Sequence, residues 1–595
     1  MLMRMPAGQA LQYSLGLFFS ALAMQAGAAE AERPNIVLLL ADDWGFSDVG
    51  AYGGEMATPN LDMLAARGMR FSNFHVTASC APTRSMLMTG VDNHRNGIGN
   101  MPETIPQSHI GKPGYLGVLD TNVVTVASLL RDSGYHTYIS GKWHLGHEPW
   151  NLPPARGFER SVIQADSGSD NWEMKQYLSL KPDVYWYEEG QRMDSLPADF
   201  YSSTYFVTKA IEQIESNRNS VAPFFSYIAF QANHIPLQAP QSFIDKYRGK
   251  YDQGWTVLRQ QRQAKAIELG LIPAGTPMVT MDTTLQWDAL SPEEKAYQAR
   301  RMEVYAAMAE AMDNEVGRLI AYLKETGQYD NTVFLFLSDN GSEGSDPYAT
   351  LSGRLWLDRN YDRSIDRLGS KGAYSIIGPS WASAAASPLN TYKFWAGEGG
   401  LRVPLIIAGA PGTQAGQISP AFTHVTDIVP TLLALAGVAQ PDGSYQGKSV
   451  ERMIGRNLLP VMRGQAEKVY PADQPVGYEL SGNAAIFKGD FKLLRNLPPI
   501  GDGQWHLYDL SHDPGETTDL QAQHPELFQQ MISDYEAYAR DNGVLPMPEG
   551  YDPINQVFIN SMINVYLPQV KRWGIPLLLL VIAGIYLLRR RRKQR

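Results

Sequence analysis

The sequence predicts an α/β fold in which helices flank a mostly parallel central sheet, and three observations support this. Two continuous apolar runs, "PNIVLLL" at residues 34–40 and "NTVFLFL" at residues 331–337, show no alternation of apolar and polar residues. Such runs are typical of strands that are buried on both faces, as in parallel sheets. Segments with helical spacing alternate with strand-like segments over roughly 400 residues, as βαβ units require. A content of 44% hydrophobic and 19% charged residues excludes disorder as the main state.

Both ends of the chain carry patterns that predict membrane signals. Residues 1–28 combine Arg4, an apolar run and small residues, as in a secretory signal peptide. Near the other end, residues 573–588 are sixteen uncharged residues that predict a transmembrane helix, slightly short of the ~17 to 25 residues a span needs. The basic residues 589–595 then predict a cytoplasmic tail. We therefore expect an exported protein on the periplasmic side of the bacterial inner membrane, held by a single-pass C-terminal anchor.

Helices can be placed between the strands from their local signals. Residues 58–71 begin with Thr-Pro and continue with helical spacing, while residues 125–134 end in a glycine. A strand follows directly in "HTYISGKWHLG", residues 136–146. A long insertion then carries four aromatic residues, which either line a ligand site or form a local core: Trp172, Tyr185, Trp186 and Tyr187.

A smaller unit follows the alternating segments. After about residue 440, the segments 484–496 and 505–520 predict hairpin strands, and residues 524–543 predict a closing helix. We expect a first domain over 34–440, a second over 441–543 and a connector over 544–570.

Polar side chains follow both continuous strands at the point where each ends. Asp42 and Asp43 come after the first strand, and Asp339 and Asn340 after the second. Ligands of parallel sheets gather at the carboxyl ends of the strands. Carboxylate and amide oxygens suit a hard cation such as Ca²⁺ or Mg²⁺. One such pair alone is usually a turn or a helix cap, but the two pairs together favour a cation site.

The only cysteine, Cys80, lies in "TASCAPTRSMLMTG". A lone cysteine is most often a small buried apolar residue. Here, however, Pro82 suits the first turn of a helix that reaches Gly90, so Cys80 would lie at a helix N-terminus, where anions are stabilised. Arg84 adds a cation one turn later. A nucleophile, an anion site and a cation within five residues predict a reactive centre.

These residues carry a resemblance to a known family. Cys80, Pro82 and Arg84 match the C-x-P-x-R core of the type I sulfatases, members of the alkaline-phosphatase superfamily, and the chain is similar in particular to bacterial arylsulfatases. The resemblance extends from about Pro34 to about Gly543. It rests on further motifs in the same order: "ADDWGFSDVGAYGGEMATPNLD", "GKWHLG", "SDNG", "EGGLRVP" and "WHLYDLSHDPGETTDL". It implies an alkaline-phosphatase-like large domain and a smaller C-terminal α+β domain with an antiparallel sheet.

The resemblance also implies cofactors and roles. A maturation enzyme would convert Cys80 to formylglycine, whose hydrate attacks sulfur with one hydroxyl and releases sulfate with the help of the other. One Ca²⁺ would contact the modified Cys80 and be bound by Asp42, Asp43, Asp339 and Asn340. Sulfate would be held by Arg84, Lys142 and Lys393, the hydrate would contact His144, and His234 would serve the leaving oxygen. Other histidines, such as His94 and His506, match no family catalytic position and are predicted to be structural.

The implied function is hydrolysis of small sulfate monoesters by an arylsulfatase-like enzyme. A phosphonate monoester or phosphodiester hydrolase with the same formylglycine centre is the alternative among enzymes. An inactive, membrane-anchored binder of sulfated polymers is the alternative of another class. The net charge of −10 argues against a nucleic-acid partner, and it requires that locally placed cations attract an anionic substrate.

Overall fold

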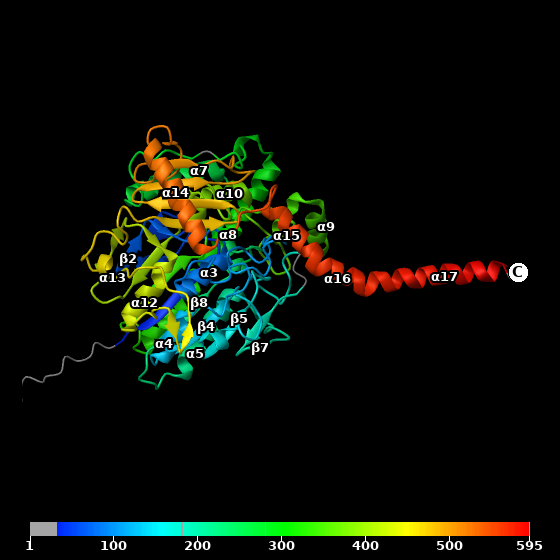
Figure 1. Ribbon diagram of the computed structural model, residues 1–595, viewed down its shortest axis with the longest axis horizontal. Helices are drawn as coiled ribbons and strands as arrows, with labels where there is room; N and C mark the ends of the chain where they lie inside the picture. Colours follow the sequence, from blue (N-terminus) through cyan, green and yellow to red (C-terminus); the bar gives the residue numbers. More distant parts are fainter. Residues whose placement is uncertain (1–32, 180–182, 280, 594–595) are drawn as a thin grey trace, which may run out of the picture.

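A ten-stranded sheet forms the centre of the large α/β domain in the computed structural model, which describes residues 33–179, 183–279 and 281–593 (Figure 1). The predicted signal peptide lies outside the described residues. From edge to edge, the strands are β11 (Gln417–Ser419), β2 (Gly68–Phe71), β10 (Leu405–Ala408), β9 (Thr332–Ser338), β1 (Asn35–Ala41), β8 (Phe224–Ala229), β4 (His136–Lys142), β5 (Arg160–Gln164), β6 (Trp186–Glu188) and β7 (Gln191–Arg192).

The middle of this sheet is parallel. β9, β1, β8, β4 and β5 all run in the same direction. Antiparallel pairing occurs toward the margins, where β10 pairs with β9 and β2, and β6 pairs with β5 and β7. The predicted fold class of the large domain is therefore confirmed.

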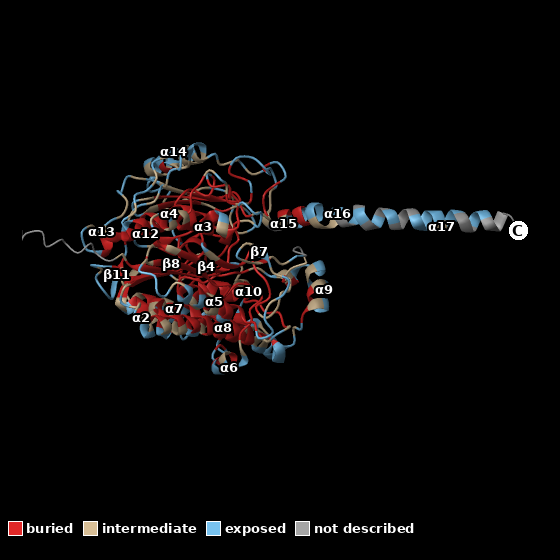
Figure 2. Ribbon diagram, turned by 90° about the horizontal axis from the view of Figure 1, so that it is seen from below, coloured by how far each residue is buried: buried red, intermediate tan, exposed pale blue. Residues whose placement is uncertain are grey.

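Both faces of the sheet are buried, which explains why its strands lack alternation. In β1, Ile36, Leu38 and Leu40 belong to one core, whereas Val37, Leu39 and Ala41 belong to the other. Helices cover the two faces from opposite sides (Figure 2). One face packs against α2 (Pro59–Arg67), α5 (Ser202–Ser216), α7 (Gly254–Glu268), α8 (Pro292–Glu325) and α10 (Gly378–Ala385), and the other against α3 (Cys80–Thr89), α4 (Val126–Asp132) and α12 (Ile428–Ala436).

Local sequence signals set several helix ends, but the helical stretch predicted over residues 58–71 stops at Arg67, and residues 68–71 form β2 instead. α2 starts at Pro59, and α4 follows Thr125, whose side chain accepts a hydrogen bond from the backbone N–H of Ser128. α3 ends at Gly90, which adopts a φ of 69° and donates its N–H to the carbonyl of Met86. Of the insertion aromatics, Trp186 is fully buried and packs against Phe206, so the local-core interpretation holds for this residue.

A second, antiparallel sheet lies toward the C-terminus, as the fold prediction requires. Its strands are β15 (Val476–Leu480), β16 (Asn483–Lys488), β17 (Phe491–Arg495) and β18 (His506–Asp509), in that order. One face packs against α14 (Pro525–Asn542) through a small core that includes Leu493 and Met531.

Short elements complete the chain. β3 (Phe74–His75) pairs with β12 (Thr423–His424), and β13 (Ser444–Tyr445) pairs with β14 (Lys448–Ser449). The short helices are α6 (Gln241–Ile244), α9 (Leu351–Asn360), α11 (Glu398–Leu401), α13 (Leu459–Met462), α15 (Pro553–Ser561) and α16 (Leu567–Gln569), and the last helix is α17 (Ile575–Lys593).

The predicted transmembrane helix is not borne out. α17 extends away from the body (Figure 1), and it begins only at Ile575, after the π-helical turn Val570–Gly574. Its uncharged part ends at Leu588 and is fourteen residues long, which rises ~21 Å against the ~30 Å of a bilayer core. Among the described residues, no helix is long and apolar enough to cross a membrane. The prediction of a single-pass C-terminal anchor is therefore wrong.

Candidate active site

The candidate site lies where β1 and β9 end side by side. Ala41 and Ser338 are paired in register, so the residues after them, Asp42–Asp43 and Asp339–Asn340, come together. The backbone N–H of Asp43 donates to Oδ1 of Asp339 over 3.3 Å. All four side chains are fully buried.

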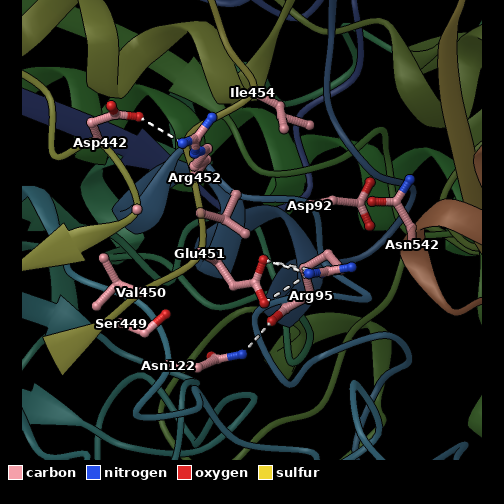
Figure 3. A pocket seen from close by; sticks show the side chains of 12 residues that line it. Asp92, Arg95, Asn122, Asp442, Ser449, Val450, Glu451, Arg452, Ile454 and Asn542 are labelled. Carbon is pink, nitrogen blue, oxygen red and sulfur yellow. Dashed lines mark hydrogen bonds and ion pairs between the residues drawn. The ribbon is translucent and has the colours of Figure 1, made fainter.

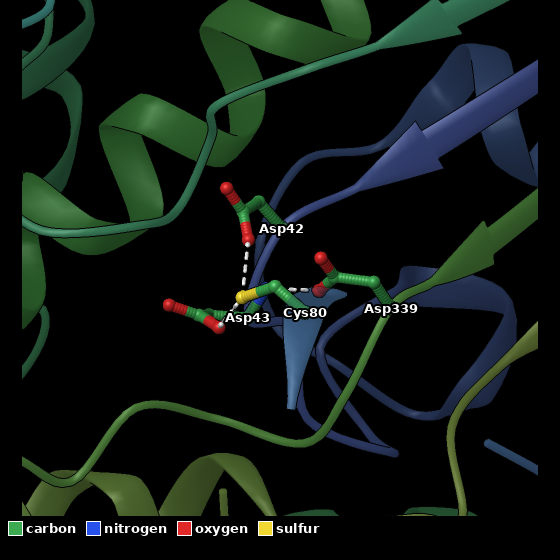
Figure 4. A group of neighbouring side chains, drawn as sticks. All are labelled: Asp42, Asp43, Cys80 and Asp339. Carbon is green, nitrogen blue, oxygen red and sulfur yellow. Dashed lines mark hydrogen bonds between the residues drawn. The ribbon is translucent and has the colours of Figure 1, made fainter. Parts of the chain in front are cut away.

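Cys80 enters this group from the first residue of α3 (Figure 4). Its Sγ lies 3.5 Å from Oδ1 of Asp42 and 4.0 Å from Oδ1 of Asp43. One ligand atom each from Asp42, Asp43, Cys80 and Asp339 can be chosen so that all lie within 4.8 Å of one another. The structure therefore brings together the residues that were predicted to bind a metal.

Two oxygens at this site are available for a ligand. Asn340 donates through Nδ2 to Oδ1 of Asp43 over 2.6 Å, which leaves its Oδ1 as an acceptor. Across the described part of the chain, neither Asn340 Oδ1 nor Asp43 Oδ2 has a hydrogen-bond partner, although both are buried. Because buried polar atoms are normally satisfied, these oxygens fit a site for a cation.

The three predicted cations surround the carboxylates. Arg84 donates through Nε to Oδ2 of Asp339 over 2.8 Å and through Nη1 to the carbonyl of Lys142 over 2.8 Å. Lys142 donates through Nζ to Oδ2 of Asp42 over 2.7 Å. Nζ of Lys393 lies 2.7 Å from Oδ1 of Asp43. Each cation thus faces a different carboxylate of the centre.

Glu343 is a further member of this group that no sequence motif had predicted. Its Oε2 lies 2.8 Å from Nζ of Lys393, and its side chain is buried. The sequence signal was an acidic residue just beyond "SDNG", in "SDNGSEG". Nothing local to that segment shows that a lysine fifty residues later would pair with it.

The two predicted histidines also lie near the centre. His234 can place a ring nitrogen within 4.8 Å of carboxylate oxygens of Asp43 and Glu343. Its Nδ1 lies 2.7 Å from the carbonyl oxygen of Ile235, which can only accept, so Nδ1 carries the proton. Burial and then the charges of Lys142 and Lys393 hold the pKa of His234 well below its usual value, so its Nε2 is unprotonated at neutral pH. His144 is 5% exposed, with its Nε2 3.8 Å from Oε1 of Glu103.

The carboxylates and the thiol differ in how the site shifts their pKa values. Burial, and then the charge of Asp339, raise the pKa of Asp42 to about 6, and burial raises that of Asp43 to about 8. Burial also acts on Asp339, but Arg84 and the two lysines outweigh it and lower the pKa of that carboxyl. Burial and the charge of Asp339 raise the pKa of the Cys80 thiol well above its usual value. The unmodified thiol is therefore protonated, and a nearby divalent cation would relieve the repulsion among the carboxylates.

A separate cavity of about 540 Å³ contains none of these residues (Figure 3). It is lined by side chains from the loop after α3, the β13–β14 hairpin and the end of α14. Its arginines are exposed and paired, Arg95 with Glu451 over 2.7 Å and Arg452 with Asp442 over 3.0 Å. The cavity offers no nucleophile comparable with Cys80, so the buried group at the strand ends is the better candidate.

Comparisons with known proteins agree with this choice. Residues 34–438 match the Sulfatase family, and residues 392–539 match the C-terminal family of N-sulphoglucosamine sulphohydrolase. The chain is 40% identical over 537 residues to an uncharacterized sulfatase of Schizosaccharomyces pombe, covering 88% of this chain and 96% of that protein. It is 38% identical over 444 residues to an arylsulfatase of Klebsiella aerogenes, covering 74% and 94% of the two chains.

A solved structure extends the comparison to the fold. The PsFucS1 sulfatase from Pseudoalteromonas sp. superposes with a TM-score of 0.54 at 20% identity, covering 90% of this chain and 95% of that one. The family match spans well over half of the chain, and the predicted resemblance is confirmed. The chain therefore belongs to the sulfatase family, a family of enzymes that hydrolyse sulfate esters.

Proposed function

We propose that this sulfatase is an arylsulfatase-like hydrolase of sulfate monoesters that uses Cys80, converted to formylglycine, together with one Ca²⁺. The observation that carries the proposal is the convergence of Cys80, a carboxylate cluster and three cations in one fully buried centre. The identity of 38% to the arylsulfatase of Klebsiella aerogenes supports the aryl class of substrate.

The donor set supports Ca²⁺ as the cofactor. Asp42, Asp43, Asp339 and Asn340 would hold the ion, and their oxygens are the ligands that hard cations prefer. The two buried oxygens without a partner, on Asp43 and Asn340, support direct coordination. When bound, the ion would neutralise charge that develops on the sulfuryl oxygens.

The state of the thiol supports modification of Cys80. A thiol with a raised pKa is a weak nucleophile at neutral pH, because the thiolate is the reactive form. Formylglycine instead supplies a hydroxyl nucleophile when it is hydrated. Its formation is an oxidation of Cβ with loss of the sulfur, carried out by a maturation enzyme that supplies the oxidant. Cys80 is only 1% exposed, so we infer that this partner acts before the chain has folded.

The remaining side chains have roles that fit their charges. Arg84, Lys142 and Lys393 provide the positive charge that an acidic protein needs to hold a sulfate group. His144 orients the modified residue, and His234 exchanges a proton with the leaving oxygen through Nε2. Sulfate carries negative charge that offsets the two lysines, so its binding raises the pKa of His234 toward a value suited to proton donation.

The test combines mass spectrometry with a substrate comparison. We expect the peptide containing Cys80 to have the mass of an aldehyde or its hydrate, and we expect nitrophenyl sulfate to be hydrolysed faster than nitrophenyl phenylphosphonate. Cys80→Ala is the matched control, which should fold normally and hydrolyse neither ester. Fully active protein with an unmodified thiol would exclude formylglycine, and faster turnover of the phosphonate would reassign the substrate class.

A further inference from the structure

The antiparallel sheet near the C-terminus contacts the two segments that carry Cys80 and Lys393. A separate apolar cluster joins residues of β15, β16 and β17 to Ala78, Ala396 and Leu401. Ala78 lies two residues before Cys80, and Ala396 lies three residues after Lys393. The backbone N–H of Phe394 donates to the carbonyl of Ala78 over 2.7 Å, so the two segments also hold each other.

Two asparagines of this sheet region bind the backbone that follows Lys393. Asn483, at the start of β16, donates through Nδ2 to the carbonyl of Phe394 over 3.1 Å. Asn496, just after β17, accepts the backbone N–H of Ala396 through Oδ1 over 2.8 Å. Phe394 has a φ of 78°, in the left-handed region that a residue other than glycine rarely adopts. Such a conformation persists only where its surroundings determine it.

A buried ion network holds the end of the same segment. Nζ of Lys492, on β17, lies 2.8 Å from Oε1 of Glu398 and 2.6 Å from Oε1 of Glu516. Glu516 also accepts the backbone N–H of Glu398 through Oε2 over 3.0 Å. The other carboxylate oxygen of Glu398, Oε2, lies 3.0 Å from Nε2 of His75, a residue that precedes α3 and Cys80. All these side chains are nearly inaccessible, so replacing Lys492 alone would remove the cation that lies between two buried carboxylates, and Glu398 would keep only His75 and the more distant Arg402, at 3.8 Å.

We propose that the C-terminal sheet positions the catalytic lysine: Asn483, Lys492 and Asn496 hold residues 394–398 so that Lys393 meets Asp43 and Glu343. These three residues contact the segment through its backbone and through Glu398, and they are therefore positioning residues. The inference rests on the proposed function for the role of Lys393, but the contacts themselves do not depend on it. A displacement of about 1 Å at a catalytic group can cost about 10²-fold in rate.

The activity test uses matched pairs of variants. Asn496→Leu removes the acceptor for the Ala396 N–H, whereas Asn496→Asp keeps it. We expect kcat to fall about 10-fold in Asn496→Leu and about 10²-fold in Lys492→Met, with KM changed less than kcat, and we expect Asn496→Asp to restore most of the rate. Lys488→Met is the control, because Lys488 is on the same sheet but pairs with Asp534 of α14 over 2.8 Å. It should leave kcat unchanged.

A double-mutant cycle separates positioning from general stability. If Lys492 acts through Lys393, then Lys492→Met should cost little further activity in a Lys393→Met background. Losses that multiply in the double variant, or an equal loss in Lys488→Met, would overturn the proposal.

Hydrogen exchange gives a readout that does not need activity. We expect Lys492→Met to increase deuterium uptake in peptides spanning residues 390–401, and Lys488→Met to leave it unchanged. Unchanged uptake in Lys492→Met would refute positioning even if the wild type proves to be an active sulfatase. Conversely, a wild type that hydrolyses no sulfate ester would refute the proposed function, and the exchange data would still decide the role of the sheet.

Discussion

At the scale of single residues, Asp339 connects the two halves of the candidate centre. It accepts hydrogen bonds from Arg84 and from the backbone of Asp43, and it belongs to the cluster that fits a cation. Among the three aspartates of the centre, only Asp339 has a lowered pKa, because Arg84 and the lysines outweigh the effect of burial. The surroundings of Asp339 therefore favour its ionised form more than those of Asp42 and Asp43 do.

Replacing Asp339 tests this arrangement. We expect Asp339→Asn to lower kcat/KM by at least about 10²-fold, because it removes a charged metal ligand and leaves Arg84 without its closest partner. Activity and bound Ca²⁺ should be measured together, before and after treatment with a chelator. Asp330→Asn is the control, because Asp330 is fully exposed. Near-normal turnover of Asp339→Asn with one Ca²⁺ still bound would remove Asp339 from the proposed site.

At the scale of elements, the segment after α14 is more than a linker. Tyr551 donates its hydroxyl to the carbonyl of Thr104 over 2.9 Å. Asn560 of α15 donates through Nδ2 to the carbonyls of Glu103 and Ile105, each over 2.9 Å. α15 thus packs against the loop whose Glu103 faces His144. α17, by contrast, projects away from the body (Figure 1).

Two truncations test this difference between α15 and α17. Deleting residues 568–595 should leave the melting temperature within about 1 °C of the full chain, because the bonds of Tyr551 and Asn560 remain. Deleting residues 550–595 removes these bonds, each contributing about 1 kcal/mol, and should lower the melting temperature by about 5 °C. Thermal unfolding of both proteins measures the effect. Equal melting temperatures would show that α15 adds nothing to stability.

At the scale of the whole molecule, a buried histidine joins the large domain to the C-terminal sheet and helix. His94 lies between Asp92, 3.2 Å from Nδ1, and Glu479 of β15, 2.7 Å from Nε2. Tyr538 of α14 donates its hydroxyl to Asp92 over 2.9 Å. Burial alone would lower the pKa of His94, but Asp92 and Glu479 outweigh it and raise that pKa to about 9. The structural role predicted for His94 agrees with these contacts.

The raised pKa makes this junction sensitive to pH. The pKa of His94 is higher in the folded state than in the unfolded state, so protonated His94 stabilises the fold. This stabilisation is fully present below the unfolded pKa of about 6.5, and it is lost as pH rises through the folded pKa of about 9. We expect the difference in unfolding free energy between wild type and His94→Gln to shrink by up to about 3 kcal/mol from pH 6.5 to pH 9.5. Urea unfolding at several pH values measures it. A difference that stays constant with pH would show that His94 is not charged in the folded protein.

Local signals in the sequence were enough to predict elements such as β1 and α3 and the residue types of the candidate site. Strands such as β1 could be recognised because burial on both faces requires a continuous apolar run. α3 could be placed because Pro82 favours its first turn and Gly90 its end. Asp42 and Asp339 could be paired because parallel strands end at one edge of a sheet.

Contacts between distant segments were decided only by the tertiary structure. Glu343 pairs with Lys393, and Lys492 with Glu398, across 50 and 94 residues, and no short pattern encodes such a pair. The apolar run of residues 573–588 was already slightly short for a span in the sequence, and the structure shortens it further, because α17 begins only at Ile575 after a π-helical turn. Side-chain type and local spacing report on neighbours within a few residues. The pairing of buried charges depends on the path of the whole chain, because two charged side chains come into contact only when the elements that carry them pack together.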